Sequence, residues 1–186
     1  MVTQPSPVLF TYAEYSLIPP DGKRWELIEG DFEVNPAPVT MHQVHALRLA
    51  RTLLTQLEDM RLGEVFVAPF DVILGPHNVV EPDLVVISAA HKDRVSDRGL
   101  EGIPDIIVEI LSQNRAYDEV LKRALYEKHG IPEYWIVDGA AATVTQFVLQ
   151  EGRYTVHAVR GREDTLTSPQ FNGRVQVALS YVFAPR

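Results

Sequence analysis

The chain has 186 residues, a length that suits one domain with its own hydrophobic core. Its formal net charge of −8 counts against a broad basic surface for nucleic acid, although a local basic groove is not excluded. It contains no cysteine, which excludes disulfides, thiolate nucleophiles and cysteine-ligated zinc. No signal peptide and no apolar run of membrane-spanning length is visible, so we expect a cytoplasmic protein with no membrane partner.

The first third of the chain predicts a β-hairpin and then a long helix. Residues 25–34 form two short strand-like runs around Glu29-Gly30-Asp31, which is a turn signal. Thr40 and Gln43 have the spacing of a capping box. Apolar residues at helical spacing behind them predict a helix over residues 41–60. The buried face of this helix is expected to hold Met41, Val44, Leu47, Leu54 and Leu57.

The middle of the chain predicts two paired strands, a loop and a central strand. Residues 64–74 and 79–87 are rich in β-branched and aromatic residues and are separated by a turn at residues 75–78. Residues 88–103 are polar and predict a loop. Residues 106–111 are apolar apart from Glu109, which indicates a strand buried on both faces.

The last third predicts a second helix and more strands. The helix covers residues 117–129 and ends at Gly130. A strand over 134–138 and a hairpin over 143–149 and 153–160 follow, and the tail at 174–183 is a further strand or a short helix. We therefore expect an α+β fold, a mixed central β-sheet flanked by two main helices with extra β-hairpins. It would be one domain, with an N-terminal extension (1–20), a core (25–150) and a C-terminal hairpin and tail (151–186).

Two acids inside apolar segments carry the strongest functional signal. Asp83 precedes the run Leu84–Ile87, and Glu109 lies within the predicted central strand. A buried carboxylate costs several kcal/mol unless it is paired or binds a metal ion. Carboxylate oxygens suit Mg²⁺, which polarises a phosphoryl oxygen and lowers the pKa of an attacking water. Lys122 on the next helix is placed to orient that water or to stabilise the developing charge.

Each of these residues also has a purely structural explanation. A proline followed by Asp83 is common turn chemistry. An ion pair with Arg115 or Arg123 would satisfy Glu109. Lys122 taken alone is typical of a solvated helix face. The order of the three residues, an acid, an acid in a central strand and then a lysine on a helix, favours the metal site.

Several stretches, in this order and spacing, resemble the PD-(D/E)xK nuclease superfamily. The resemblance is to its bacterial branch of restriction-endonuclease-like proteins, which is abundant in cyanobacteria and thermophiles. It covers about residues 25–150 and rests on Trp25–Asp31, His42-Gln43, Ala68–Val72, Glu81–Leu84, Pro104–Ser112 and Asp118–Asp138. It implies a restriction-endonuclease-like core and an endonuclease that uses Mg²⁺, or Mn²⁺ in its place, to hydrolyse phosphodiester bonds in DNA.

The resemblance also implies roles for single residues. Asp83 takes the place of the first acid and Glu109 that of the second, and both would bind Mg²⁺ together with the main-chain carbonyl of Ile110. The superfamily pattern has a lysine two residues after the second acid, where this chain has Leu111. Lys122 is therefore the expected replacement.

Other residues allow two interpretations. Glu26 resembles a family position that adds an acid to the metal site, but it is equally an exposed hairpin residue. His42 faces either the site or the helix cap. Asp118 either holds Lys122 in an ion pair or stabilises an exposed helix. The pair Tyr134-Trp135 is more typical of a core or dimer contact than of a base-stacking platform.

Two rival hypotheses remain open at the level of the sequence. The acidic net charge and Leu111 favour an inactive nuclease fold that serves as a module for binding nucleic acid or protein. Alternatively, the acids only form internal ion pairs in a protein that does not meet nucleic acid. If the chain is an active endonuclease, cutting both strands needs two sites, which favours a homodimer or a higher homo-oligomer.

Overall fold

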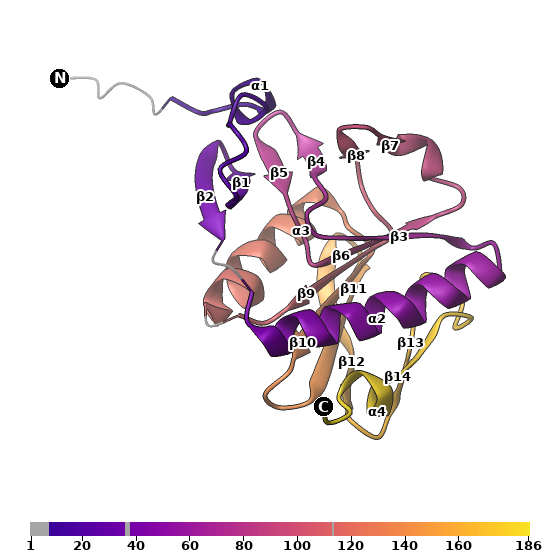
Figure 1. The fold of residues 1–186 in the computed structure, drawn as a ribbon. Helices are drawn as coiled ribbons and strands as arrows, with labels where there is room; N and C mark the ends of the chain where they lie inside the picture. The colour runs from indigo at the N-terminus through magenta and orange to yellow at the C-terminus, as the bar shows by residue number, and fades with distance from the viewer. Residues whose placement is uncertain (1–7, 36–37, 113) are drawn as a thin grey trace.

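A computed structural model describes residues 8–35, 38–112 and 114–186. These residues form two mixed six-stranded β-sheets, a two-stranded hairpin and two main helical segments (Figure 1). The prediction of an α+β fold with a mixed central sheet and two main helices is confirmed, and the second six-stranded sheet goes beyond it. No helix of the described residues is long and apolar enough to cross a membrane.

The central sheet has the strand order β12-β11-β10-β9-β6-β3. Only β9 and β10 are parallel, and the other neighbours are antiparallel. All five residues of β9 are buried, as expected for a strand with neighbours on both sides and cover on both faces. The strands are β3 (Gly63–Val67), β6 (Leu84–Ser88), β9 (Ile106–Ile110), β10 (Glu133–Asp138), β11 (Thr143–Gln150) and β12 (Arg153–Gly161).

The second sheet has the order β2-β1-β5-β4-β8-β7 and contains the predicted N-terminal hairpin. Its turn places Glu29 and Gly30 in the left-handed region, at φ 53° and 86°, the geometry that a two-residue hairpin turn demands. A short helix α1 (Tyr12–Tyr15) precedes it. The strands are β1 (Arg24–Ile28), β2 (Asp31–Asn35), β4 (Val72–Gly75), β5 (Asn78–Val80), β7 (Val95–Ser96) and β8 (Gly99–Glu101).

The two long strands predicted over 64–74 and 79–87 are each divided between the sheets. Residues 64–74 contribute β3 to the central sheet and β4 to the second, and residues 79–87 contribute β5 and β6. Pro69 and Pro82 lie at the two crossings, where the missing N–H cannot join a ladder. The predicted loop at 88–103 also contains a 3₁₀ turn, η1 (Lys92–Arg94), and the strands β7 and β8.

Helix α2 (Thr40–Asp59) has the predicted length, but its cap and its buried face differ from the prediction. Its N-cap is Val39, with no side-chain capping bond, because the helix already includes Thr40. The buried residues are His45, Leu49, Leu53 and Leu57, so Leu57 alone was assigned correctly as fully buried. Met41, Leu47 and Leu54 are exposed. Apolar residues occur on two sides of this helix, and spacing alone did not show which side faces the sheet.

The second helical segment begins as a π-helix, η2 (Tyr117–Lys122), and continues as α3 (Arg123–His129). It ends at Gly130, with φ 78°, as predicted. The C-terminal part supplies β13 (Thr165–Thr167), β14 (Gln176–Ala178) and α4 (Leu179–Val182), so the tail holds both a strand and a short helix.

Two hydrophobic cores cover the faces of the central sheet. Residues of α2 and of the C-terminal part pack on one face, including Leu49, Val177 and Val182. The second sheet and α3 cover the other face through residues such as Ile28 and Tyr126 (Figure 1). Tyr134 and Trp135 are both fully buried, as their core interpretation predicts.

Candidate active site

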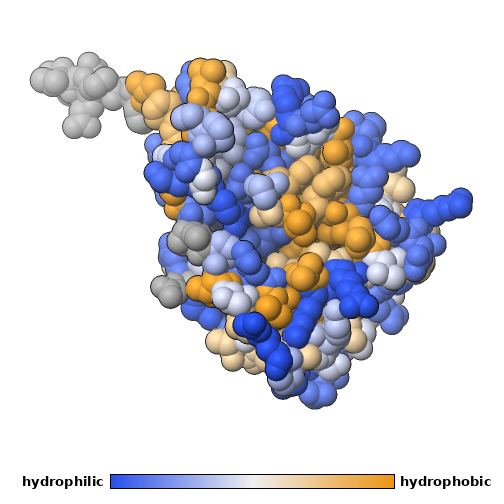
Figure 2. Space-filling model, in the orientation of Figure 1, coloured by the Kyte–Doolittle hydropathy of each residue, from blue (hydrophilic) through white to orange (hydrophobic). Residues whose placement is uncertain are grey.

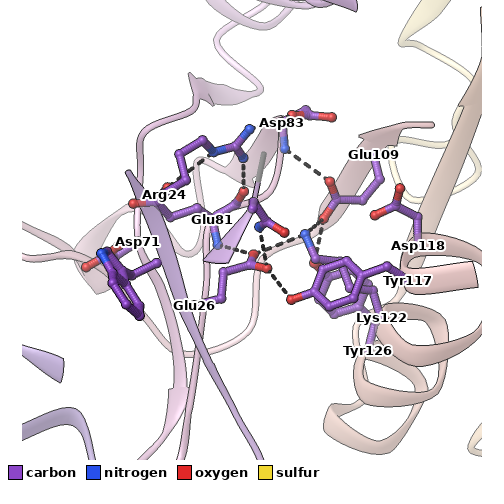
Figure 3. Close-up of polar contacts among 12 residues, drawn as sticks. Arg24, Glu26, Asp71, Glu81, Asp83, Glu109, Tyr117, Asp118, Lys122 and Tyr126 are labelled. Carbon is purple, nitrogen blue, oxygen red and sulfur yellow. Dashed lines mark hydrogen bonds and ion pairs between the residues drawn. The ribbon is translucent and has the colours of Figure 1, made fainter. Parts of the chain in front are cut away.

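The structure brings the two predicted acids together. Asp83 lies just before β6 and Glu109 lies in β9, and the register of these antiparallel neighbours pairs Leu84 with Val108. The main-chain N–H of Asp83 donates to Oε2 of Glu109 at 3.4 Å (Figure 3). The N–H of Ile110 donates to Oδ2 of Asp83 at 2.8 Å. The two acidic residues are only 6% and 3% exposed.

Lys122 reaches the same place from η2. Its Nζ lies 2.8 Å from Oε1 of Glu109 and 3.0 Å from Oε1 of Glu26, and the residue is 1% exposed. A solvated helix face is therefore the wrong description of this lysine. The alternative partner Arg115 instead pairs with Glu119 and Asp138 at the surface. A π-helical turn shifts the facing of the residues that follow it, and such turns are frequent at functional sites.

Glu26 is a buried member of this cluster and not an exposed hairpin residue. It is 0% exposed, and its oxygens accept hydrogen bonds from Asn35, from the Tyr117 hydroxyl and from the main-chain N–H of Glu81, each at 2.7 Å. Burial alone would raise the pKa of Glu26, but Lys122 and these donors hold it below its ordinary value. Glu26 is thus an anion that keeps the Lys122 ammonium in place.

Tyr126 is a partner of Glu109 that the sequence reasoning missed. Its hydroxyl donates to Oε1 of Glu109 at 2.7 Å, the oxygen that also meets Lys122. The other oxygen, Oε2, points toward Asp83. The available signal was the four-residue spacing of Lys122 and Tyr126, which puts both on one helix face.

Asp83 is held from the other side by a histidine and an arginine side chain. Nε2 of His42 lies 2.9 Å from Oδ2, and Nη1 of Arg24 lies 3.4 Å from Oδ1. His42 therefore faces the site and not the helix cap. Burial raises the pKa of Asp83, but the His42 contact, the N–H of Ile110 and Arg24 hold it below its ordinary value. Nothing in the sequence pointed to Arg24, which begins β1 and reaches Asp83 only through the fold.

Carboxylates outnumber the cations that face them. Burial raises the pKa of Glu109 to about 8, with Lys122 opposing the rise and Asp83 adding to it. Burial also raises the pKa of Asp118 to about 6, and this side chain lies beside Glu109 (Figure 3). Asp118 forms no ion pair within 4.0 Å of Lys122 and is only 6% exposed, so neither of its two interpretations, an ion pair with Lys122 or an exposed helix residue, describes it.

These groups line a cavity of about 590 Å³. Asp83, Glu109, Asp118 and Lys122 contribute to its wall, together with apolar residues such as Met41. A hollow of this size that combines apolar walls with a few converging polar groups is typical of a small-molecule or reactive site. In the described part of the chain, no group of three or more histidine, cysteine, aspartate or glutamate side chains is arranged so that it could bind a metal ion.

Comparison with known proteins gives the family. The family model "Uma2: Putative restriction endonuclease" matches residues 12–180. The chain belongs to the Uma2 family. This agrees with the resemblance of the sequence to nucleases. The matched span includes every residue that lines the cavity.

A solved structure supports the fold of this Uma2 protein. It is similar to a "putative nuclease belonging to DUF820" from Anabaena variabilis ATCC 29413, with a TM-score of 0.76 and 21% sequence identity. The similarity covers 96% of this chain and 98% of the other. At this identity the likeness shows the shared fold. A comparison with curated proteins found no match.

Proposed function

We propose that this Uma2 protein is a Mg²⁺-dependent endonuclease that hydrolyses phosphodiester bonds in DNA. The observation that carries the proposal is that the side chains of Asp83 and Glu109 lie together. The Glu109 carboxylate accepts from the main-chain N–H of Asp83, and the Asp83 carboxylate accepts from the N–H of Ile110, next to Glu109. Lys122 forms an ion pair with Glu109. Membership of a restriction-endonuclease family supports the reaction class. The pairing with a buried lysine supports a site that handles a phosphate.

The donor set fits a divalent cation. Asp83, Glu109 and the main-chain carbonyl of Ile110 would hold Mg²⁺, and Mn²⁺ would substitute because it accepts the same oxygen ligands. The raised pKa values of Glu109 and Asp118 support this fit: burial raises both, neighbouring acids add to the rise, and a bound cation would stabilise the charged forms. When bound, the ion would polarise the phosphoryl oxygen and make the attacking water more acidic.

The side chains around the acids would position the reacting groups. Lys122 and Tyr126 hold Oε1 of Glu109 and so orient Oε2 toward Asp83. Lys122 would also stabilise the charge that develops on the phosphate. Glu26 would keep Lys122 charged and fixed, which makes it an acid of the site that need not touch the metal.

A plasmid assay tests the proposal. Supercoiled DNA incubated with the protein and Mg²⁺ is expected to be nicked or cut, and chelation of the metal is expected to stop the reaction. Asp83→Asn and Glu109→Gln should each lower the rate roughly a hundredfold or more, since a metal contributes several kcal/mol to such a reaction. Glu101→Gln, at an exposed ion pair outside the cavity, is the matched control. Absence of cleavage of every DNA form at high protein concentration would refute the proposal.

One set of contacts favours a second candidate, a nuclease fold that binds nucleic acid without cutting it. Asp83 is already paired with His42 and Arg24, and Lys122 is tied to two carboxylates. Leu111 also stands where the superfamily pattern has lysine. This candidate predicts DNA binding that weakens steeply with salt, with no turnover in Mg²⁺ or Mn²⁺. A flat response to salt would instead point to a protein that does not bind nucleic acid.

A further inference from the structure

Strand β3 is an edge of the central sheet, and its outer side has no partner strand among residues 8–35, 38–112 and 114–186. Leu62 accepts from the N–H of Ala89, and Ala68 donates to the carbonyl of Asp83. Backbone groups of an antiparallel strand alternate in direction, so these two bonds fix which residues face β6. The N–H and C=O groups of Gly63, Val65 and Val67 therefore point away from the sheet.

This edge carries few of the devices that keep other sheet edges from pairing. Natural edges are commonly protected by lysine, proline, bulges or charged side chains. β3 reads Gly-Glu-Val-Phe-Val, and its one charged residue, Glu64, alternates onto the face opposite α2. The other edge, β12, carries Arg153 and Arg160 and meets β11 with a register shift. Of the two edge strands of the central sheet, β12 thus has features that oppose pairing with another strand, and β3 has few of them.

Exposed apolar side chains surround the free edge. Leu47 and Leu54 of α2 are 72% and 42% exposed, Val67 is 48% exposed, and Val65 is partly buried against the core. We call these four residues the β3 face. Hydrophobic side chains gather in the middle of the side of the molecule drawn in Figure 2, over β3 and along α2. An apolar patch beside an open strand edge is typical of a protein interface.

We propose that the β3 face binds a second copy of this chain, with the two β3 strands paired antiparallel about a two-fold axis at Val65. Each β3 strand would supply main-chain hydrogen-bond partners to the open edge of the other, and the two central sheets would form one continuous sheet. In this register Gly63 lies opposite Val67 of the partner subunit. Leu54 of the two copies would pack together on the face covered by α2.

The charges on α2 fit the same axis. Leu47, Arg51, Leu54 and Glu58 follow one another at spacings of four, three and four residues and form one stripe. In two antiparallel copies of this stripe centred next to Leu54, Arg51 of each copy would face Glu58 of the other. Within its own subunit the Arg51 guanidinium lies 3.2 Å from the Tyr181 hydroxyl, a surface contact that it would exchange for the carboxylate. The stripe is therefore complementary to itself in charge, with leucine at its centre.

The turn between α2 and β3 brings the strand next to the same part of the helix. β3 returns alongside α2 after a short turn, in which the N–H of Leu62 donates to the carbonyl of Leu57 (Figure 1). Val65 lies two residues beyond Gly63, about 7 Å along the strand. The strand therefore runs back past the C-terminal half of α2, which holds Leu54 and Glu58.

The oligomeric state tests the proposal. Sedimentation or light scattering of the wild-type protein across the micromolar range is expected to show a dimer. Leu54→Glu should raise the dimer dissociation constant at least about tenfold, as loss of a central interface residue does. Val156→Glu, at a similarly exposed valine on β12, should leave it unchanged. Val65→Pro should also give a monomer, because the N–H that it removes faces outward, so no hydrogen bond to β6 is lost.

A charge exchange tests the register. Arg51→Glu and Glu58→Arg should each weaken the dimer about two- to tenfold, since two symmetric, exposed ion pairs are lost. The double variant should recover the wild-type dissociation constant. A monomeric wild-type protein, or a dimer that Val156→Glu disrupts and Leu54→Glu does not, would overturn the proposal. None of the five substituted positions lines the cavity, so the outcome is independent of whether the protein cuts DNA.

Discussion

Removal of the buried lysine gives the sharpest test of the charge arrangement at the site. In Lys122→Met the side chain keeps its approximate length but loses the ammonium that contacts Glu109 at 2.8 Å and Glu26 at 3.0 Å. Loss of one partner of a buried ion pair costs about 3–5 kcal/mol, because the remaining charge stays in a poorly solvated place. For a chain of this length that free energy corresponds to a fall in Tm of roughly 6–20 °C.

The loss should also depend on pH, with a defined sign. Without the lysine the folded-state pKa of Glu109 rises further above its unfolded value, and Glu26 loses the cation that holds its pKa below the ordinary value. The folded protein then binds more protons than the unfolded chain, so stability falls as pH rises. The difference in Tm between wild type and Lys122→Met is therefore expected to be larger at pH 8 than at pH 5.

Lys128→Met is the matched control for thermal unfolding. It removes a lysine of the same helical segment whose pair with Glu29 is exposed, at 63% and 52% side-chain exposure. Such surface pairs contribute about 0–1 kcal/mol. Equal and small changes in Tm for the two variants would refute the view that Lys122 is a buried counter-ion of the two carboxylates.

Three further outcomes are expected in equilibrium unfolding. Tyr126→Phe should cost about 1–3 kcal/mol at neutral pH and weaken divalent-ion binding measured by calorimetry, because Glu109 loses a buried donor. Because the folded pKa of Asp118 is raised, the wild type should lose up to roughly 3 kcal/mol of stability as pH rises from about 4 through 6. Asp118→Asn should abolish this pH-dependent loss, and an unchanged pH profile in the variant would contradict the prediction. Leu49→Ala, at a fully buried position, should cost about 2–5 kcal/mol, whereas Leu47→Ala, at an exposed one, should change the stability of the folded subunit by less than about 0.5 kcal/mol.

The elements that could be predicted from the sequence are those set by local pattern. The hairpin at Glu29-Gly30, the all-buried strand around Glu109 and the helix end at Gly130 each carry their signal within a few residues. The sheet crossings at Pro69 and Pro82 could not be read this way, because an apolar run looks the same in either sheet. The buried face of α2 failed for a related reason: apolar side chains lie both on the core side and on the β3 face.

The residues of the candidate site also fall into those that the sequence indicates and those that only the fold reveals. A carboxylate inside an apolar strand needs a partner wherever the chain folds, so Glu109 stood out without any knowledge of its neighbours. Its partners could not be predicted with the same force. Arg24 and His42 reach Asp83 from elements far away in the sequence, and the π-helical start of η2 that turns Lys122 inward has no recognised local signal.

A crystal structure with Mn²⁺ would test the central claim most directly. We expect anomalous density between Asp83 and Glu109, in contact with a carboxylate oxygen of each, and its disappearance in Asp83→Asn. Manganese bound elsewhere, or no bound manganese at a concentration that supports DNA cleavage, would contradict the assignment of these two acids to the metal.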